Sequence, residues 1–301
     1  MGEELLMSKI INNERLTGER AAYGVKDVQL NNCVFEDGES PLKHSVNIEC
    51  NQTAFKWKYP VWHSSNVKIN NSAIFEGGRA GIWYTDHIDV TDTVIEAPKE
   101  FRRCNHVTLK NVTFTNAEET FWSCNEVNFD HVTAKGNYFA MNSSNMKMDN
   151  FTLVGNYPFD GCKNIEIHNS RLLSKDAFWN CENVTVYDSY VCGEYFGWNS
   201  KNITLVNCTI ESNQGFCYIN NLTMKDCTLI NTDLAFEYTT NIDANLKGKI
   251  ISVKNPGSGK IVAQEIGELI LDETKIDIKS TEIVCDKIGK TTLGISDSSS
   301  I

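Results

Sequence analysis

The sequence is poor in proline and has no excess of positive charge. Only 5 of its 301 residues are proline, and 28 Lys and Arg stand against 39 Asp and Glu, giving a formal net charge of −11 and a pI near 5.1. A nucleic-acid partner would need a basic stripe on the surface, which this balance disfavours while leaving room for a local basic pocket. We therefore expect no nucleic-acid partner.

Long apolar runs and targeting signals are also missing. No stretch approaches the roughly 20 apolar residues of a membrane span, and the opening MGEELLMSKI lacks the basic flank and apolar run of a secretory signal. The eleven cysteines form no CxxC pair, which argues against a zinc ribbon or a thioredoxin-like motif. We expect a cytoplasmic protein without membrane contact, whose reduced thiols act as small apolar residues.

Motifs for nucleotides, flavins and metals are absent as well. The sequence contains no GxxxxGK[ST], no GxGxxG after a strand, no HExxH and no GxSxG. We therefore predict no cofactor and no metal site.

What the chain does contain is an internal repeat. An apolar-x-apolar triplet, usually preceded by Asn, recurs every 18–21 residues over most of the sequence. A second short apolar segment follows each triplet after an Asn or Asp turn, and no segment is long enough for an ordinary helix. The triplets begin at Val28, Val46, Val67, Ile88, Val107, Val127, Met146, Ile165, Val184, Ile203, Leu222, Ile242 and Ile261.

This repeat predicts the fold. Two or three short strands in about 19 residues make one coil of a solenoid, and parallel crossovers are right-handed by default. We predict an all-β fold: a single-stranded right-handed parallel β-helix of about 12–13 coils with terminal caps. Coils about 4.8 Å apart would align the Asn side chains into a ladder. The expected regions are an N-terminal cap at 1–24, the β-helix at 25–290 and a disordered tail at 291–301.

When successive coils stack, equivalent positions of the repeat form columns along the solenoid. Six residues before each triplet lies a column of large apolar residues, including Phe121 and Phe178, which we place in the core. Three residues before the triplet lies a column of Ser, Thr and Cys, including Cys124 and Cys181, which suits an inward corner where a large side chain would clash. The alternative for these cysteines is metal or redox chemistry.

Five of the six tryptophans share the column between these two. Period-2 geometry places that column outside if the apolar column is inside. Outward aromatics offer flat apolar faces to sugar rings beside hydrogen-bonding groups, so the band suggests carbohydrate binding. The alternative is an aromatic surface covered by the termini or by another chain. The five residues are Trp62, Trp83, Trp122, Trp179 and Trp198.

Cationic side chains gather beside this band within four consecutive coils, where Arg could hold a uronate, phosphate or carboxylate. His63 or Tyr84 could act as the base and Arg102 as the electrostatic stabiliser, and these three are the predicted catalytic residues if the protein is an enzyme. A solvated polar stripe is the alternative. The predicted substrate-binding residues are Lys43, His44, Trp62, Trp83, Arg103, Trp122, Asp160, Trp179 and Trp198.

Paired carboxylates, by contrast, are not evident. Glu39, Glu100, Asp160 and Glu237 are read as outward acids, but the tryptophan column contains no carboxylate pair from adjacent coils. Glu118 and Glu119 lie nearby but in a turn. Three coils separate Glu100 from Asp160, or roughly 14 Å, whereas glycoside hydrolysis uses carboxylates about 5–9 Å apart. If the protein is an enzyme, a carbohydrate-active lyase or isomerase is therefore favoured over a paired-carboxylate hydrolase.

Several phrases resemble a known family: RAAY at 20–23, YPVWH at 59–63, RAGIWY at 79–84, DAFWNCENVTV at 176–186 and GEYFGWNS at 193–200. They are similar to the family catalogued as domain of unknown function 3737, over about residues 14–290. The resemblance implies an architecture like the right-handed parallel β-helices of the pectin-lyase-like superfamily. It implies no activity, because the family has no assigned reaction, and the polysaccharide lyases, hydrolases and epimerases of the superfamily are an analogy of fold.

Two functional hypotheses remain. In the first, the protein binds or processes a carbohydrate or sugar acid along the aromatic band. In the second, it is a non-catalytic interaction or assembly module, such as a homo-oligomer, that uses the same band.

Overall fold

The computed structural model describes residues 9–294. Residues 1–8 of the predicted cap and 295–301 of the predicted tail lie outside the described residues. The chain divides into two compact units, residues 1–152 and 153–301. Within residues 9–294, no helix has the length and apolar character needed to cross a membrane.

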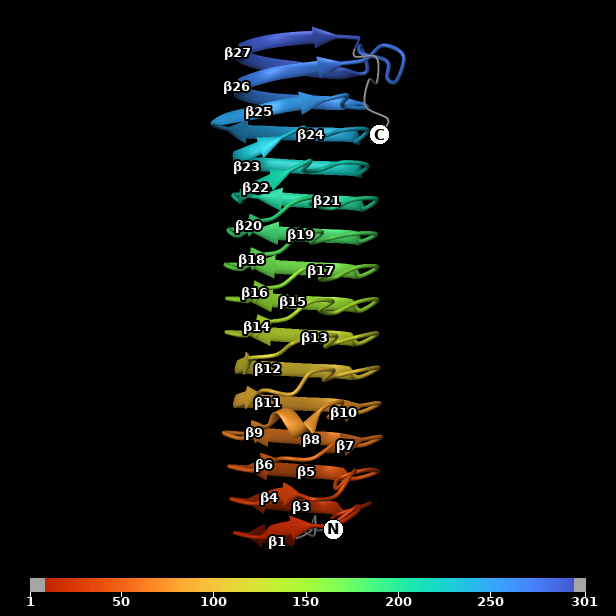
Figure 1. Cartoon of the computed structure of the whole chain (residues 1–301), viewed down its shortest axis with the longest axis vertical. Coiled ribbons are helices and arrows are strands. Elements are labelled where there is room, and N and C mark those ends of the chain that lie inside the picture. The colour runs from red at the N-terminus through yellow and green to blue at the C-terminus, as the bar shows by residue number, and fades with distance from the viewer. Residues whose placement is uncertain (1–8, 295–301) are drawn as a thin grey trace, which may run out of the picture. The chain divides into compact units, whose positions relative to one another are not determined.

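In the first unit, short strands pair in parallel, coil upon coil, from β1 to β15 (Figure 1). Pairing joins equivalent positions of successive repeats, for example Val67 with Ile88 and Ile88 with Val107. One 3-10 turn, η1 (Glu76–Gly78), interrupts the strands. The strands are β1 (Lys9–Asn12), β2 (Arg15–Thr17), β3 (Lys26–Asn31), β4 (Val34–Glu36), β5 (Val46–Asn51), β6 (Ala54–Phe55), β7 (Val61–Trp62), β8 (Ser65–Asn70), β9 (Ala73–Ile74), β10 (Ile82–Trp83), β11 (Asp86–Ile95), β12 (Asn105–Phe114), β13 (Asn125–Asp130), β14 (Thr133–Lys135) and β15 (Ser144–Asp149).

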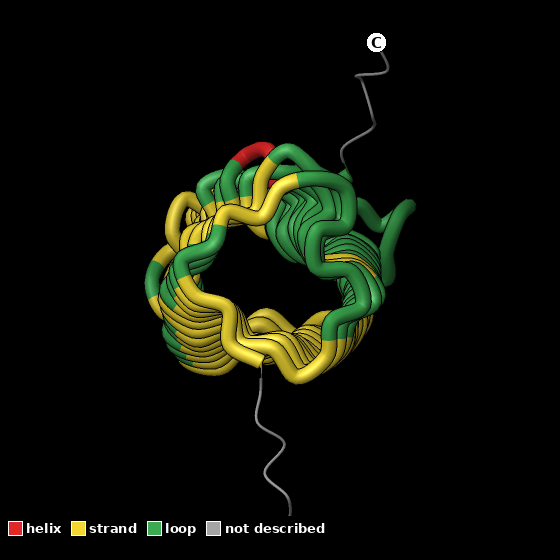
Figure 2. Tube along the Cα trace, turned by 90° about the horizontal axis from the view of Figure 1, so that it is seen from below, coloured by secondary structure: helices red, strands yellow, loops and turns green. Residues whose placement is uncertain are grey.

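The second unit repeats this arrangement. Parallel pairs again join positions one repeat apart, such as Val184 with Ile203 and Ile203 with Leu222. Within each unit, strands and loops recur at the same places around the coil (Figure 2), so the predicted parallel β-solenoid is confirmed. The strands are β16 (Thr152–Val154), which begins at the boundary, β17 (Lys163–His168), β18 (Arg171–Leu173), β19 (Glu182–Tyr187), β20 (Tyr190–Cys192), β21 (Lys201–Val206), β22 (Thr209–Asn213), β23 (Asn220–Asp233), β24 (Thr240–Lys247), β25 (Lys249–Lys254), β26 (Gly259–Leu271) and β27 (Thr281–Leu293).

The predicted register is wrong by two residues at two coils. Val28 pairs with Ile48 and not with Val46, and Ile242 pairs with Gly259 and not with Ile261. Alternating patterns match themselves after a shift of two residues, so apolar spacing alone leaves this ambiguity.

Paired strands also extend beyond the predicted coils. β1 pairs with β3, and β27 pairs with β26, although neither segment has an Asn before an apolar-x-apolar triplet. β1 and β2 lie within the predicted cap at 1–24, and β27 enters the predicted tail at 291–301.

Aromatic side chains fill the interior, as the apolar column predicted. In the first unit the rings of Phe101 and Phe121 stack with centres 4.5 Å apart and planes 4° apart. In the second, Phe159 and Phe178 stack at 5.5 Å and 11°. All four are fully buried, and a buried side chain of this kind contributes roughly 1.5–3 kcal/mol. These stacks join one coil to the next inside each unit.

The small column lines an inward corner, as predicted, and its side chains also make hydrogen bonds. Ser143 Oγ donates to the carbonyl of Phe121 at 2.6 Å and accepts from the backbone N–H of Cys124 at 2.8 Å. Cys181 Sγ donates to the carbonyl of Phe159 at 3.0 Å. All eleven cysteines are free thiols, and those of this column serve packing and backbone satisfaction.

The predicted Asn ladder is present along the outside of both units. Asn66 Nδ2 donates to Asn47 Oδ1 at 2.9 Å, and Asn202 Nδ2 donates to Asn183 Oδ1 at 2.8 Å. These residues have positive φ values, for example 54° at Asn66 and 57° at Asn202. Asn tolerates this left-handed region better than most residues, so the column serves both the turn and the contact between coils.

Candidate functional site

The tryptophans of the first unit form a continuous stack with one arginine. The rings of Trp62 and Trp83 lie 5.0 Å apart with planes 6° apart. The guanidinium carbon of Arg102 lies 4.5 Å from the ring centre of Trp83 and 4.5 Å from that of Trp122. All four side chains are partly exposed, so the column faces outward in this unit, as the period-2 pattern predicted.

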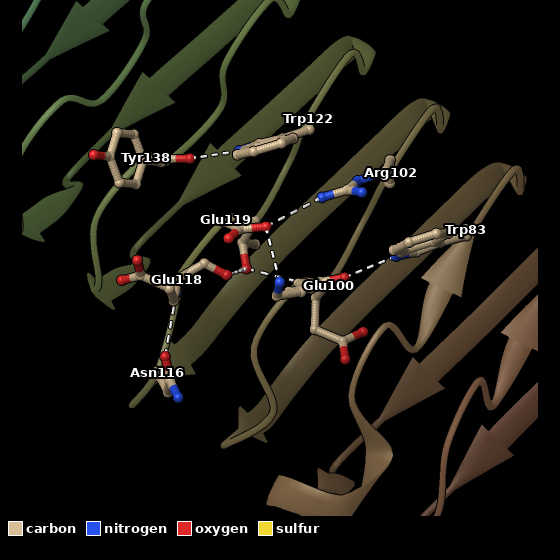
Figure 3. A network of polar contacts seen from close by, with 10 residues as sticks. Trp83, Glu100, Arg102, Asn116, Glu118, Glu119, Trp122 and Tyr138 are labelled. Carbon is tan, nitrogen blue, oxygen red and sulfur yellow. Dashed lines mark hydrogen bonds and ion pairs between the residues drawn. The ribbon is translucent and has the colours of Figure 1, made fainter.

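The indole N–H groups of this stack are already used. Trp83 Nε1 donates to the backbone carbonyl of Lys99 at 2.8 Å, and Trp122 Nε1 donates to that of Tyr138 at 2.6 Å (Figure 3). Trp62 makes the same kind of bond at 2.6 Å. A sugar ring needs an open aromatic face, whereas here most faces are covered by the next member of the stack. The stack therefore acts mainly as a lateral tie between coils.

Arg102 is held between the rings without a close anionic partner. Its Nη2 lies 3.6 Å from Glu119 Oε2 (Figure 3), which is too long for a hydrogen bond, and Lys99 Nζ lies closer to the same oxygen at 3.1 Å. The Nε and Nη2 atoms of Arg102 are buried and make no hydrogen bond. Since both guanidinium faces are covered, the predicted role as an electrostatic stabiliser would have to use the remaining edge.

A second stack runs beside the tryptophans. His44 and His63 stack at 5.2 Å and 15°, and His63 and Tyr84 at 4.7 Å and 4°. Arg103 Cζ lies 5.9 Å from the ring centre of Tyr84. Desolvation, followed by the charges of His44 and Lys43, lowers the pKa of His63. The structure thus brings the predicted cationic group together, while its catalytic and binding roles stay predictions.

Glu100 corrects the sequence interpretation, because it points into the core and not along the outward band. It is fully buried; its Oε1 accepts from the backbone N–H of Gly81 at 3.0 Å, and its Oε2 has no partner. Burial raises the pKa of this carboxyl well above its usual range. The next residue, Phe101, has a φ of 52°, which breaks the alternation so that both side chains point inward. Phe139 and Phe196, at the equivalent position of other coils, are buried too.

The second unit contains a pocket of about 490 Å³. This volume is within the range of about 300–1,000 Å³ that small-molecule sites occupy. Aromatic rings from successive coils form much of its wall, and three polar side chains complete it. The lining residues are Tyr157, Lys175, Asp176, Trp179, Tyr195, Trp198 and Gln214.

The rings of this pocket are splayed, unlike the parallel stack of the first unit. Trp179 and Trp198 are 6.5 Å apart with planes 41° apart. Tyr157 meets Trp179 edge-on at 75°, and Tyr195 meets Trp198 at 82°. Rings that do not cover one another leave parts of their faces toward the pocket.

At this pocket, Asp176 interrupts a column of tyrosines. Tyr157, Asp176, Tyr195 and Gln214 follow one another at intervals of 19 residues. The backbone N–H of Asp176 bonds to the coil after it, through Glu194, just as that of Tyr157 bonds to Lys175. Where the column would supply a phenol ring, Asp176 supplies a short carboxylate and leaves the ring's volume open.

Two residues that line this pocket each have a buried polar atom without a partner: Asp176 Oδ1, an acceptor, and Trp179 Nε1, a donor. Each such atom costs about 1–3 kcal/mol, and native proteins seldom leave one unpaired. Burial raises the pKa of Asp176 to about 6, an effect that Lys175 opposes and Glu194 reinforces. Lys175 Nζ itself pairs with Glu194 Oε2 at 2.9 Å. The arrangement is suited to a ligand that both donates and accepts hydrogen bonds.

Of the residues predicted in this half of the chain, Trp179 and Trp198 line the pocket, whereas Asp160 accepts a hydrogen bond from Asn180 at 2.7 Å. Sequence reasoning missed the polar lining. The signal that could have revealed it is the loss of Tyr at Asp176 within a column that has Tyr on both neighbouring coils. The lining residues that were not among the predicted binding residues are Tyr157, Lys175, Asp176, Tyr195 and Gln214.

The repeating coils define the protein as a parallel β-solenoid. The chain belongs to the family described as protein of unknown function (DUF3737), whose model matches residues 9–284. No functionally curated protein matches the chain.

Solved structures with a similar fold include the tailspike protein of E. coli bacteriophage HK620 in complex with a pentasaccharide. It is 10% identical, the match covers 94% of this chain and 73% of a double mutant or 72% of the unmutated tailspike, and the TM-score is 0.36 in both cases. A tailspike variant in complex with a hexasaccharide gives 10% identity, coverage of 94% and 73%, and a TM-score of 0.35. Likeness at this level concerns the fold alone.

Proposed function

We propose that the pocket of the second unit binds a neutral saccharide. The observation that carries this proposal is the pair of unsatisfied atoms, Asp176 Oδ1 and Trp179 Nε1, which belong to residues of a pocket lined by four aromatic side chains. A sugar hydroxyl can donate to the carboxylate while another accepts from the indole N–H. The C–H faces of the sugar ring can pack on the splayed aromatic faces.

Charge favours a neutral sugar over a sugar acid in this pocket. The ammonium group of Lys175 is already paired with Glu194, while Asp176 carries a negative charge above pH 6 that lacks a hydrogen-bond donor at Oδ1. An anionic ligand would bring like charges together in a partly desolvated site. A sugar acid therefore remains a hypothesis for the cationic group of the first unit.

Binding is favoured over hydrolysis at this site. Glycoside hydrolysis uses two carboxyl groups that flank the bond to be broken. Asp176 is the one carboxyl group among the lining residues, and the nearby Glu194 is engaged by Lys175. Assembly through aromatic residues stays a prediction from the sequence.

Isothermal titration with a panel of neutral mono- and disaccharides, beside the corresponding uronic acids, tests the proposal. We expect at least one neutral sugar to bind, and Trp179→Phe to weaken it about tenfold by removing one hydrogen-bond donor, worth ~1.4 kcal/mol. Asp176→Tyr should abolish binding because it restores the ring that the tyrosine column otherwise supplies. This variant also removes an unpaired carboxylate, so it should fold at least as stably as the wild type.

Trp57→Ala is the matched control, since Trp57 is 42% exposed and is not among the residues that line the pocket. It should leave sugar affinity unchanged. Absence of binding by every neutral sugar, or undiminished binding by Asp176→Tyr, would rule out this pocket as the site.

The affinity should depend on pH through Asp176. Its pKa is raised to about 6, so the carboxylate is mostly ionised at pH 7.5 and mostly protonated at pH 5. A hydroxyl donates more strongly to a charged acceptor, so affinity should fall about fivefold between pH 7.5 and pH 5, corresponding to ~1 kcal/mol. Asp176→Asn should bind without this dependence. Titrations at both pH values check the result, and an equal change in affinity for the wild type and the Asp176→Asn variant would contradict it.

A further inference from the structure

Two histidines and two acidic residues lie close together on the surface of the first unit, although they form no contiguous metal-binding motif in the sequence. Asp86 and His87 begin β11, His106 lies in β12 one coil further on, and Glu126 lies in β13 on the next. Strand pairing places Ile88 beside Val107 and Val107 beside Val127. The residues just before these three therefore occupy the same position on three successive coils.

The donor atoms of this cluster converge. Asp86 Oδ1 lies 2.8 Å from His106 Nδ1, and Asp86 Oδ2 lies 3.1 Å from His87 Nδ1. One ligand atom from each of these residues lies within 4.8 Å of the others. On the far side of its ring, His106 Nε2 lies 3.2 Å from Glu126 Oε2. Donor atoms around a tetrahedral zinc ion are separated by roughly 3.3 Å. The distances from Asp86 to His106 and from Asp86 to His87 are already close to this value.

The cluster also breaks the local rule of the fold. The residue before the triplet is usually Asn in the left-handed conformation, with its amide bonded to the next coil, as at Asn66 and Asn47. Here three consecutive coils have His87, His106 and Glu126, with φ values of 56°, 53° and 54°. The backbone still adopts the conformation that suits Asn, while the side chains are ones that bind metals. Departures from local consistency of this kind concentrate at functional sites.

We propose that Asp86, His87 and His106 bind a divalent transition-metal ion, best matched by Zn²⁺. Two imidazoles select such an ion over Mg²⁺ and Ca²⁺, which prefer oxygen ligands. His106 binds through Nδ1, and its Nε2–H donates to Glu126, which orients the ring and raises its basicity. The two rings now stack at 4.3 Å and 18°; side chains that are 58% and 43% exposed can tilt to direct both nitrogens at one ion.

An adjoining groove leaves the ion an open face. It has a volume of about 200 Å³ and is lined by His87, Asp89, His106, Thr108, Glu126 and Asn128. Three protein ligands and an open fourth position are the arrangement of zinc sites that take water or an exchangeable ligand. No metal site was predicted from the sequence, which lacks HExxH. A search for contiguous motifs cannot find this cluster, because its side chains come from separate coils.

The test is calorimetric titration of ZnCl₂ into the chelator-treated full chain, with MgCl₂ as the comparison ion. A Cys192→Ser/Cys285→Ser background removes the two thiols that are not buried. We expect one zinc equivalent to bind at the cluster and magnesium to give no heat. His87→Asn and His106→Asn should each weaken zinc affinity at least tenfold. Both restore the residue typical of the column, so the fold should be retained, which circular dichroism verifies.

His131→Asn is the matched control. His131 also faces a carboxylate, Asp130, and also stands at a position where other coils have a left-handed Asn, but it is outside the three-residue cluster. Its replacement should leave zinc affinity unchanged. The proposal is overturned if zinc gives no binding heat, or if the His87 and His106 variants bind it as tightly as the parent. Either result would mean that the cluster is a set of surface ion pairs and not a metal site.

Discussion

Replacing Glu100 by glutamine should stabilise the protein at pH 7, by up to about 3 kcal/mol, and have almost no effect near pH 4. The carboxyl group is fully buried and one of its oxygens has no partner, so the folded protein favours its protonated form. In the unfolded chain the group ionises with an ordinary pKa of 4.5. Holding the proton therefore costs about 1.4 kcal/mol for each pH unit between that value and the folded pKa. Glutamine has the same shape and no such cost.

The sign follows from the direction of the shift. A carboxyl group whose pKa is raised by folding contributes its full stability below pH 4.5 and loses it as the pH rises toward the folded pKa. Space at this site is limited, because a Cβ at Gly81 would lie 2.4 Å from Glu100 Oε2, so a substitution must keep the volume.

Urea unfolding at pH 4.5, 6 and 7.5, followed by circular dichroism, measures the effect. Glu96→Gln is the control: Glu96 is an exposed glutamate at the end of a neighbouring coil, and its replacement should change the free energy of unfolding by no more than about 0.5 kcal/mol at each pH. If Glu100→Gln changed the free energy of unfolding equally at all three pH values, folding would not raise the pKa of Glu100, and the expectation would be wrong.

The fold could be predicted from the sequence because a solenoid repeats the same coil many times, so that each structural position occurs in the sequence many times. Apolar residues about 19 apart show which positions lie over one another, and the small column shows where the corner is tight. Register could not be fixed at every coil, since Val46 and Ile48 fit the same alternating pattern. Glu100 escaped prediction because the bulky residue after it, Phe101, adopts a left-handed φ that such residues rarely take.

The candidate site was less predictable for a different physical reason. The Trp column was correctly placed outside, but sequence does not show whether rings stack or splay. That difference separates the parallel rings of Trp62 and Trp83 from the tilted rings of Trp179 and Trp198. At the pocket, Asp176 replaces the tyrosine that both neighbouring coils have. A repeat is recognised by the residues that recur from coil to coil. A single position where the recurring residue is replaced therefore contributes little to the pattern.

The largest loss of stability is expected for Arg102→Ala, at about 2–4 kcal/mol. Its guanidinium lies between two indoles at 4.5 Å from each, and a desolvated cation–π contact contributes up to about 2 kcal/mol. The aliphatic stem is packed as well, so alanine would leave a gap in the stack that neighbouring rings only partly close. Arg102→Lys should lose less, because it keeps the charge and the stem but lacks the flat group that fills the space between rings.

Urea unfolding measures this loss, and near-ultraviolet circular dichroism reports whether the packing of Trp83 and Trp122 is disturbed. Arg103→Ala is the matched control, because Arg103 is exposed and contacts a single ring, that of Tyr84; a change within about 0.5 kcal/mol is expected. A structural Arg102 predicts that saccharide affinity at the second unit's pocket is unchanged while stability falls. If Arg102 instead serves mainly to contact a substrate, Arg102→Ala should leave the free energy of unfolding unchanged. That result would favour the catalytic role predicted from the sequence.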